Sequence, residues 1–209
     1  LFGPSAAGGA YIPSFCDIVI MVEGNASMYL GSPRMAEEVI GERVTLEEMG
    51  GARMHASVSG CGDNLVADDE EALEEAKVFF GYLPGSFREA PPTYGGSDVA
   101  VALDSSVVPE VESEPFDMHR VIEGLVDADS FFELKPEFAA ELITGFGRLD
   151  GRTVGIVANN SAVRGGVLFN DTDSDNAAPD RPGAPGGSRS TRLGWAAAAL
   201  LAIALAAIA

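Results

Sequence analysis

The chain has 209 residues, of which 46% are hydrophobic, and its formal net charge is −19. This length and apolar content suffice for a buried core in one or two domains, which excludes a disordered chain. A protein with so much negative charge is a poor partner for nucleic acid or for an anionic membrane.

The acidity is concentrated in residues 1–176, which hold 31 of the 32 acids and 10 of the 13 bases. The sequence contains only two lysines, Lys77 and Lys135. Because the acids are spread over predicted helix faces, we interpret them as a hydrated surface adapted to a high-salt cytoplasm, with a cation-binding cluster as the alternative. Cys16 and Cys61 stand in no CxxC pair, so we expect a reducing compartment and two buried thiols.

The first feature along the chain is a glycine-rich run at residues 3–11, GPSAAGGAY. Paired glycines adopt backbone angles that other residues avoid, and they let a ligand approach the backbone closely. A helix that begins there directs unpaired N–H groups toward one point, where they can stabilise a negative charge. The run predicts an oxyanion hole, with an ordinary glycine turn as the simpler alternative.

Local signals in the first half predict elements with defined ends. Residues 17–22 are a β-branched apolar run of strand length. Ser32, followed by a first-turn proline, predicts the start of a helix that stops at Gly41. Thr45 and Glu48 have the spacing of a capping box, which predicts another short helix.

The next segment combines a polar loop, a helix and a linker. His55 lies in the loop predicted at residues 54–60, and we interpret it as a structural or pocket-lining residue rather than an acid or base. Asp68 predicts the N-cap of an amphipathic helix at residues 69–80. The side chains expected to be buried on this helix are Ala72, Leu73, Ala76, Val78, Phe79 and Phe80. The proline-rich residues 84–116 predict a linker or domain boundary.

The second half repeats this alternation of helices and strands. Asp117 predicts the cap of a helix on which His119 faces solvent, and residues 131–134 predict a short strand. Asp150-Gly151 is a strong hairpin signal between two apolar segments. A further helix is expected to begin near Asp175. The alternation predicts an α/β layered fold.

Residues 177–209 differ in composition from the rest, with a segment rich in Pro, Gly and Arg followed by an apolar run. The run covers residues 193–209 and is shorter than the roughly 20 residues needed to span a bilayer. We interpret this tail as unnatural sequence, of the kind that a GC-rich gene gives when it is read in the wrong frame. A membrane anchor is the alternative.

Several different short motifs are distributed over residues 1–176. They are residues 3–17, 42–52, His55, 59–60, 82–84, 117–118, 121–122, 130–136, 144–146 and 151–159. In this order and spacing they resemble the carboxyltransferase (β) subunit of biotin-dependent acyl-CoA carboxylases, and the propionyl-CoA carboxylase type most of all. Several motifs in order are more specific than any one alone.

The resemblance implies a crotonase-like (ClpP/crotonase) α/β fold of layered ββα units, with parts of two consecutive domains. Residues 1–95 would be the C-terminal part of the first domain, on the acyl-CoA side. Residues 96–176 would be the N-terminal part of the second domain, on the biotin side, so the chain is expected to be incomplete. Residues 177–209 lie outside the resemblance.

The implied activity is transfer of a carboxyl group from carboxybiotin to the α-carbon of a short acyl-CoA, such as propionyl-CoA or acetyl-CoA. The resemblance places biotin on a separate carrier, implies a biotin carboxylase component and a homo-oligomer, and implies no metal in this chain. In this chemistry the protein supplies positioning and backbone donors for oxyanions.

By ungapped comparison with the family motif, the first oxyanion hole maps to the backbone N–H groups of Ala7, Gly8 and Gly9. The pairs Ala7-Gly8 and Gly8-Gly9 remain competing assignments. The residues expected in the acyl-CoA pocket are Ser5, Ala6, Ala10 and Tyr11. The second, biotin-facing oxyanion hole belongs to a later glycine motif of the family, which has no copy in this chain. Arg164, Gly165 and Gly166, with the paired glycine of the second domain, are the candidates for lining the biotin side.

Two alternative functions stay open. One is the carboxyltransferase of a sodium-pumping acyl-CoA decarboxylase, which has membrane partners, and the other is a non-catalytic remnant with the crotonase fold. The sequence contains no HExxH, GxxxxGK[ST] or GxSxG motif. Zinc protease, phosphate-loop and serine hydrolase chemistry therefore lose support.

Overall fold

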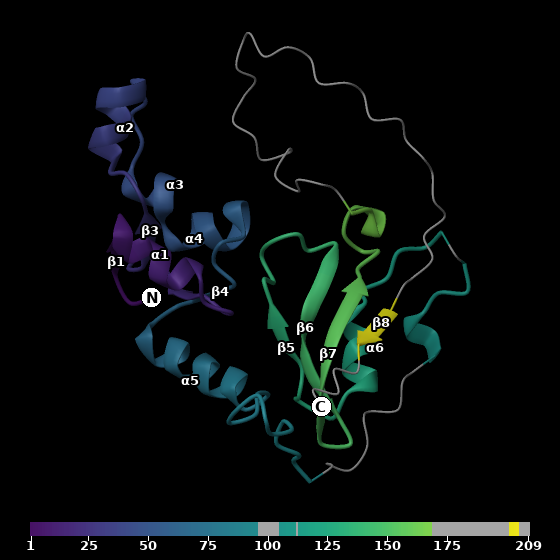
Figure 1. The fold of residues 1–209 in the computed structure, drawn as a ribbon. Coiled ribbons are helices and arrows are strands. Elements are labelled where there is room, and N and C mark those ends of the chain that lie inside the picture. Colours follow the sequence, from purple (N-terminus) through teal and green to yellow (C-terminus); the bar gives the residue numbers. More distant parts are fainter. Residues whose placement is uncertain (96–104, 112, 169–200, 205–209) are drawn as a thin grey trace.

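The computed structural model describes residues 1–95, 105–111, 113–168 and 201–204, and Figure 1 shows their arrangement. Residues 1–95, the first part, combine short parallel strand pairs with helices. Residues 105–168, the second part, are built around an antiparallel sheet beside one helix.

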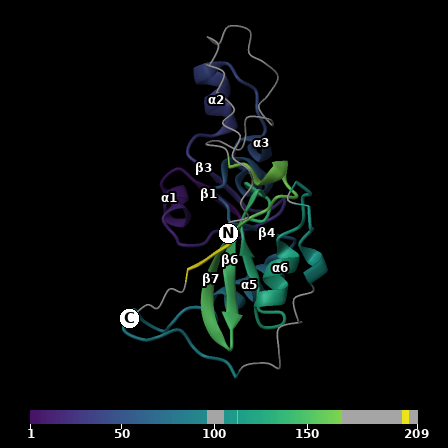
Figure 2. The same ribbon diagram turned by 90° about the vertical axis from the view of Figure 1, so that its right-hand side faces the viewer.

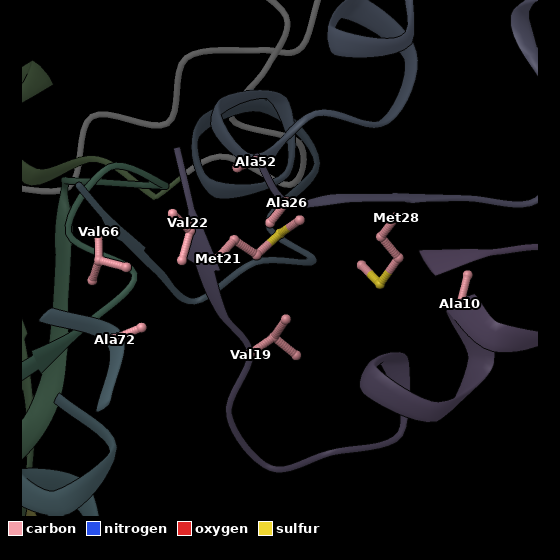
Figure 3. Packing of buried hydrophobic residues seen from close by; sticks show 9 residues of the cluster. All are labelled: Ala10, Val19, Met21, Val22, Ala26, Met28, Ala52, Val66 and Ala72. Atoms are coloured by element: carbon pink, nitrogen blue, oxygen red, sulfur yellow. The ribbon is translucent and has the colours of Figure 1, made fainter. Parts of the chain in front are cut away.

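The first part is organised around two parallel strand pairs. β1 (Pro4–Ala6) pairs with β3 (Ser27–Tyr29), and β2 (Ile20–Val22) pairs with β4 (Asn64–Val66). The strand predicted at residues 17–22 is thus confirmed over its last three residues. α1 (Gly8–Ser14) follows β1 directly. Figure 3 shows the core that joins these elements, which consists of Ala10, Val19, Met21, Val22, Ala26, Met28, Ala52, Val66 and Ala72.

The predicted helix ends are confirmed where local side chains supply the cap. α2 (Pro33–Ile40) begins after Ser32, whose side chain accepts the Met35 N–H, and it ends at the left-handed Gly41. α3 (Leu46–Gly50) has the predicted capping box. α4 (Ala52–Met54) then runs into a π-helical turn, His55–Ser59, in place of the predicted loop.

α5 (Asp69–Phe80) is capped by Asp68 as predicted, but half of its expected buried stripe is exposed. Ala72 and Phe79 are buried, whereas Leu73, Val78 and Phe80 are exposed. The reason is geometric, because positions 72, 76 and 79 share one helix face and the other apolar residues fall outside it.

The second part supplies three strands of a four-stranded antiparallel sheet with the order β5-β6-β7-β8, and β8 comes from the C-terminal tail. The strands of the sheet are β5 (Phe132–Leu134), β6 (Leu142–Leu149), β7 (Arg152–Asn159) and β8 (Leu201–Ala204). Asp150 and Gly151 both have positive φ, which confirms the predicted hairpin turn. α6 (His119–Leu125) lies beside the sheet in Figure 2 and supplies Val121 and Ile122 to its core.

Direct contacts join the two parts. Phe79 and Tyr82 pack against Phe132 and Phe146, and the Tyr82 hydroxyl donates to the Ser130 carbonyl at 2.5 Å. Ion pairs link Lys135 to Asp63 at 2.8 Å and Arg53 to Glu137 at 3.3 Å. The domain limits themselves stay a prediction.

Tyr94, at the end of the described part of the predicted linker, is held against the hairpin turn. Its N–H donates to the Gly151 carbonyl at 3.0 Å, and a Cβ on Gly151 would stand 1.6 Å from the Tyr94 oxygen. The Arg148 guanidinium lies over the rings of Tyr82 and Tyr94, at 4.2 and 4.3 Å from their centroids. Cation–π stacking therefore ties residue 94 to both parts.

Most of the tail and the helix expected near Asp175 lie outside the described residues. Leu201–Ala204 is the described exception, and it pairs with β7. Among the residues that the structure does describe, no helix is long and apolar enough to cross a membrane.

Candidate functional site

The glycine-rich run forms a turn between β1 and α1 that leaves two backbone donors unpaired. Ala7 has φ 49° and ψ −121°, a conformation that non-glycine residues rarely adopt. Its N–H donates to the Tyr29 carbonyl at 2.8 Å. The N–H groups of Gly8 and Gly9 have no partner within the described residues. Of the two competing pairs, only Gly8-Gly9 therefore has both donors available to a ligand.

The structure gives no internal reason for a glycine at position 8. A Cβ built on Gly8 would have no heavy atom within 4 Å, and its φ is not positive. A Cβ on Gly9 would meet only the Ser5 hydroxyl, at an ordinary 3.6 Å. Glycine in a helix is less stable than alanine by roughly 0.5–1 kcal/mol, so these two residues weaken α1 without relieving a clash.

The residues predicted for the acyl-CoA pocket separate onto different sides of α1. Ala10 and Tyr11 line an apolar pocket of about 670 Å³. Ser5 lines a second, smaller pocket of about 420 Å³ together with Gly9, and its hydroxyl donates to the Gly9 carbonyl at 3.0 Å. Ala6 is exposed and lines neither pocket.

The larger pocket lies between α1, β3 and α2. Its apolar walls include Met35, Val39 and Ile40 of α2, all of which are exposed. His55 and Cys61 also line it. The pocket is thus apolar and wide enough for an acyl group. Its first lining residue along the chain is Ala10, which directly follows the Gly8-Gly9 pair.

The predicted burial of the two cysteines is wrong, because both are exposed. Cys61 stands in a turn between Gly60 and Gly62, where neither neighbour has a side chain to cover it. Cys16 follows the end of α1 next to Phe15, which is itself 86% exposed. Neither position offers apolar neighbours on all sides.

His55 is buried and hydrogen-bonded through both ring nitrogens, which confirms its pocket-lining and structural interpretation. Its Nε2 lies 2.6 Å from the Met28 carbonyl, and its Nδ1 lies 2.8 Å from the Ser59 hydroxyl. A carbonyl only accepts, so Nε2 carries a proton, and in the neutral ring Nδ1 accepts from the Ser59 hydroxyl. No sequence signal predicts the Met28 partner, which lies 27 residues away.

The residues expected on the biotin side form a tight turn, Arg164–Gly166, after β7. All three have positive φ. A Cβ on Gly166 would stand 1.9 Å from the Asn159 Oδ1, and the Asn159 amide donates to the Gly166 carbonyl. Gly166 therefore has a packing reason to be glycine, unlike Gly8. The biotin role of this turn stays a prediction.

The sequence predicts that His119 faces solvent, but in the structure its ring lies between two carboxylates. Nδ1 lies 2.7 Å from Asp117 Oδ1, and Nε2 lies 3.0 Å from Glu133 Oε2. Burial alone would lower the pKa of His119, but the hydrogen bonds to Asp117 and Glu133 outweigh it and raise that pKa. Within the described ranges, no group of three or more His, Cys, Asp or Glu residues is placed to hold a metal ion.

Comparison with known proteins places these features in a family. Residues 1–178 match the carboxyl transferase domain. The chain is 57% identical over 185 residues to the uncharacterized carboxylase YngE of Bacillus subtilis, with 85% of this chain and 35% of that protein covered. It is 38% identical to the propionyl-CoA carboxylase carboxyltransferase subunit of Haloferax mediterranei, with 80% and 33% covered. It is also 34% identical to the methylmalonyl-CoA decarboxylase subunit alpha of Veillonella parvula, with 80% and 34% covered.

Solved structures agree with these relatives. Transcarboxylase 12S, in a hexamer assembly with hydrolysed methylmalonyl-coenzyme A bound, matches with a TM-score of 0.76 and 33% identity, over 83% of this chain and 34% of that one. The predicted crotonase-like α/β fold class is therefore confirmed. The chain spans about a third of the length of the curated relatives it matches.

Proposed function

Because this chain belongs to the carboxyl transferase family, of the propionyl-CoA carboxylase type, we propose that it takes part in carboxyl transfer from carboxybiotin to the α-carbon of a short acyl-CoA. The observation that carries the proposal is the pair of unpaired N–H groups at Gly8 and Gly9, next to an apolar pocket. Both features suit a thioester, whose acyl group is apolar and whose carbonyl oxygen becomes negative when the α-proton leaves.

In this mechanism the turn binds the thioester oxygen and stabilises it as an enolate. The Gly8 and Gly9 N–H groups donate to this oxygen, and the absence of side chains at both positions lets it approach the backbone. Each such donor is worth on the order of 3 kcal/mol in a transition state. Ala10 and Tyr11, which follow in the same first turn of α1, contact the acyl portion in the larger pocket.

Carboxybiotin, which supplies the CO₂, is a substrate delivered by a carrier. Among the described residues, Arg164–Gly166 is the segment that we propose for its side of the site. The turn offers backbone groups after β7, but the packing role of Gly166 means that its glycine is already explained without a ligand.

The test is carboxyl transfer by the full encoded chain, with a carboxylated biotin carrier and propionyl-CoA or acetyl-CoA as acceptor. Formation of methylmalonyl-CoA or malonyl-CoA supports the proposal. Absence of transfer together with absence of acyl-CoA binding refutes it and favours the non-catalytic remnant.

The Veillonella relative favours a second candidate, the carboxyltransferase of a sodium-pumping acyl-CoA decarboxylase. The same turn would then stabilise the enolate that forms when methylmalonyl-CoA loses its carboxyl group. Carboxyl transfer from methylmalonyl-CoA to free biotin, measured beside the forward reaction, separates the two directions. Coupling to sodium transport would support the decarboxylase.

We further propose a biotin carboxylase, a biotin carrier and further copies of the chain as partners, in a high-salt cytoplasm. The acidic, lysine-poor composition supports the salt adaptation. Full stability at low salt would contradict it. We also retain the proposal that residues 177–209 are not natural sequence, which resequencing codons 170–185 of the gene tests.

A further inference from the structure

We propose that His55 is a positioning residue for the oxyanion turn and acts on it through β3. The proposal rests on the proposed function of the Gly8-Gly9 turn and adds a residue whose ring nitrogens are hydrogen-bonded to Met28 and Ser59, so that it acts on the turn through the backbone. It is carried by two sets of hydrogen bonds, one from the π-helical turn to the Met28 carbonyl and one from Ala7 to the Tyr29 carbonyl, which the β3 backbone joins.

The first set begins on the π-helical turn that holds His55. The Ser59 hydroxyl accepts the Cys61 N–H at 3.2 Å, which leaves its own proton to donate to His55 Nδ1 at 2.8 Å. His55 Nε2 then donates to the Met28 carbonyl at 2.6 Å. His55 is only 9% exposed, and its bond to the Met28 carbonyl is buried, so water does not compete well for that bond.

Met28 connects this network to the turn. β3 pairs in parallel with β1, and the register sets Met28 opposite Ser5 and Tyr29 opposite Ala6. The peptide that carries the Met28 carbonyl is followed directly by Tyr29, whose carbonyl accepts the Ala7 N–H at 2.8 Å. The imidazole thus holds the strand segment that in turn holds the strained Ala7.

The surroundings of the Met28 carbonyl leave little freedom for a replacement. A Cβ on Gly50 would stand 2.5 Å from this oxygen, so the backbone of α3 already approaches it closely. The chain therefore packs a glycine and a buried imidazole against one carbonyl of β3. Loss of the imidazole leaves a buried acceptor unpaired, which favours displacement of the strand.

The chain offers a matched pair of serines for the test. Ser57 and Ser59 share the same π-helical turn, but the Ser57 hydroxyl donates to the Arg53 carbonyl at 2.8 Å and takes no part in the His55 network. Ser59→Ala breaks the first set and Ser57→Ala does not. His55→Ala removes both bonds of the ring, whereas His55→Gln keeps an amide donor near the position of Nε2.

Two measurements separate this inference from the proposed function. The first is amide hydrogen exchange at Ala7 in the unliganded chain, which needs no substrate. We expect exchange about tenfold faster in His55→Ala, the change that loss of one ordinary hydrogen bond gives, and wild-type exchange in Ser57→Ala. Unchanged Ala7 protection in both His55→Ala and Ser59→Ala overturns the positioning role, whether or not the turn binds a thioester.

The second is the infrared carbonyl stretch of propionyl-CoA labelled with ¹³C at the thioester, bound to the full chain. We expect a shift to lower frequency in the wild type, a reduced shift in His55→Ala and Ser59→Ala at nearly unchanged affinity, and recovery in His55→Gln. A wild type that binds no propionyl-CoA refutes the proposed function instead. If His55→Ala does not fold, Ser59→Ala and His55→Gln carry both measurements.

Discussion

Replacing Gly8 by alanine should separate the stability of this chain from its chemistry. Gly8 is the first residue of α1, its φ is not positive, and a methyl group there would meet no heavy atom within 4 Å. In the absence of a ligand, Gly8→Ala therefore introduces no clash. The added methyl group would stand beside the N–H groups of Gly8 and Gly9, where the thioester oxygen is proposed to bind.

The two expected effects have opposite signs. Alanine gains up to about 1 kcal/mol over glycine in a helix interior and less at its first position, so the free energy of unfolding should stay constant or rise. Loss of one oxyanion donor typically lowers kcat by about 10² to 10³, and we expect carboxyl transfer to propionyl-CoA to fall by at least the lower figure.

Urea unfolding and a steady-state transfer assay on the same preparation provide both numbers. Gly3→Ala is the matched control, because a methyl group at Gly3 also meets no heavy atom within 4 Å and Gly3 belongs to neither pocket. Wild-type kcat in Gly8→Ala would refute the assignment of the turn. A fall in the free energy of unfolding by more than about 1 kcal/mol would refute the structural argument instead.

Three other regions give further predictions. If the acyl group occupies the larger pocket, propionyl-CoA should slow the reaction of Cys61 with a thiol reagent and leave Cys16 unchanged as the internal control; equal protection contradicts this. Arg148→Met removes the guanidinium that stacks on Tyr82 and Tyr94, so it should lower the free energy of unfolding by about 1–3 kcal/mol and speed proteolysis at residues 84–95. Arg148→Lys should be intermediate. An unchanged digestion pattern would show that the stacked rings do not hold this segment. The pKa of His119 is raised in the folded chain, so the charged ring stabilises the fold fully below its unfolded pKa, and this stabilisation is lost as pH rises through its folded pKa. His119→Gln should therefore lower the free energy of unfolding more at pH 5.5 than at pH 8. A difference that does not depend on pH would contradict this.

The sequence predicts best those elements whose ends are set by neighbouring residues. Ser32, Thr45 with Glu48, and Asp68 cap helices within three residues of themselves, and the Asp150-Gly151 turn sets its own hairpin. In each case the decisive hydrogen bonds or backbone angles are local. Tertiary packing had little opportunity to override them.

Properties set by distant residues were not predictable. The exposure of Leu73 on α5 depends on which face meets the aromatic cluster of the second part. His119 gains Glu133 from β5 as a partner because α6 lies beside the sheet. Hydrophobic type and short spacing contain no information on either contact, so the predicted burial and solvent exposure failed there.

The two glycine pairs with predicted roles in the site, Gly8-Gly9 and Gly165-Gly166, show why a motif needs a structure before its residues can be assigned roles. Gly8 and Gly166 both belong to glycine pairs, and sequence alone gives each the same capacity to bind an anion. A Cβ at Gly8 would meet no heavy atom within 4 Å, whereas a Cβ at Gly166 would stand 1.9 Å from Asn159 Oδ1. Gly166 also has a φ of 69°, which disfavours other residues. Gly166→Ala should therefore lower the free energy of unfolding by about 1–3 kcal/mol through backbone strain, with packing loss in addition. Urea unfolding of Gly166→Ala beside Gly8→Ala tests this difference between a packing glycine and a ligand-binding one. Equal stability of the two variants would show that the empty space around Gly8 does not distinguish the two kinds of glycine.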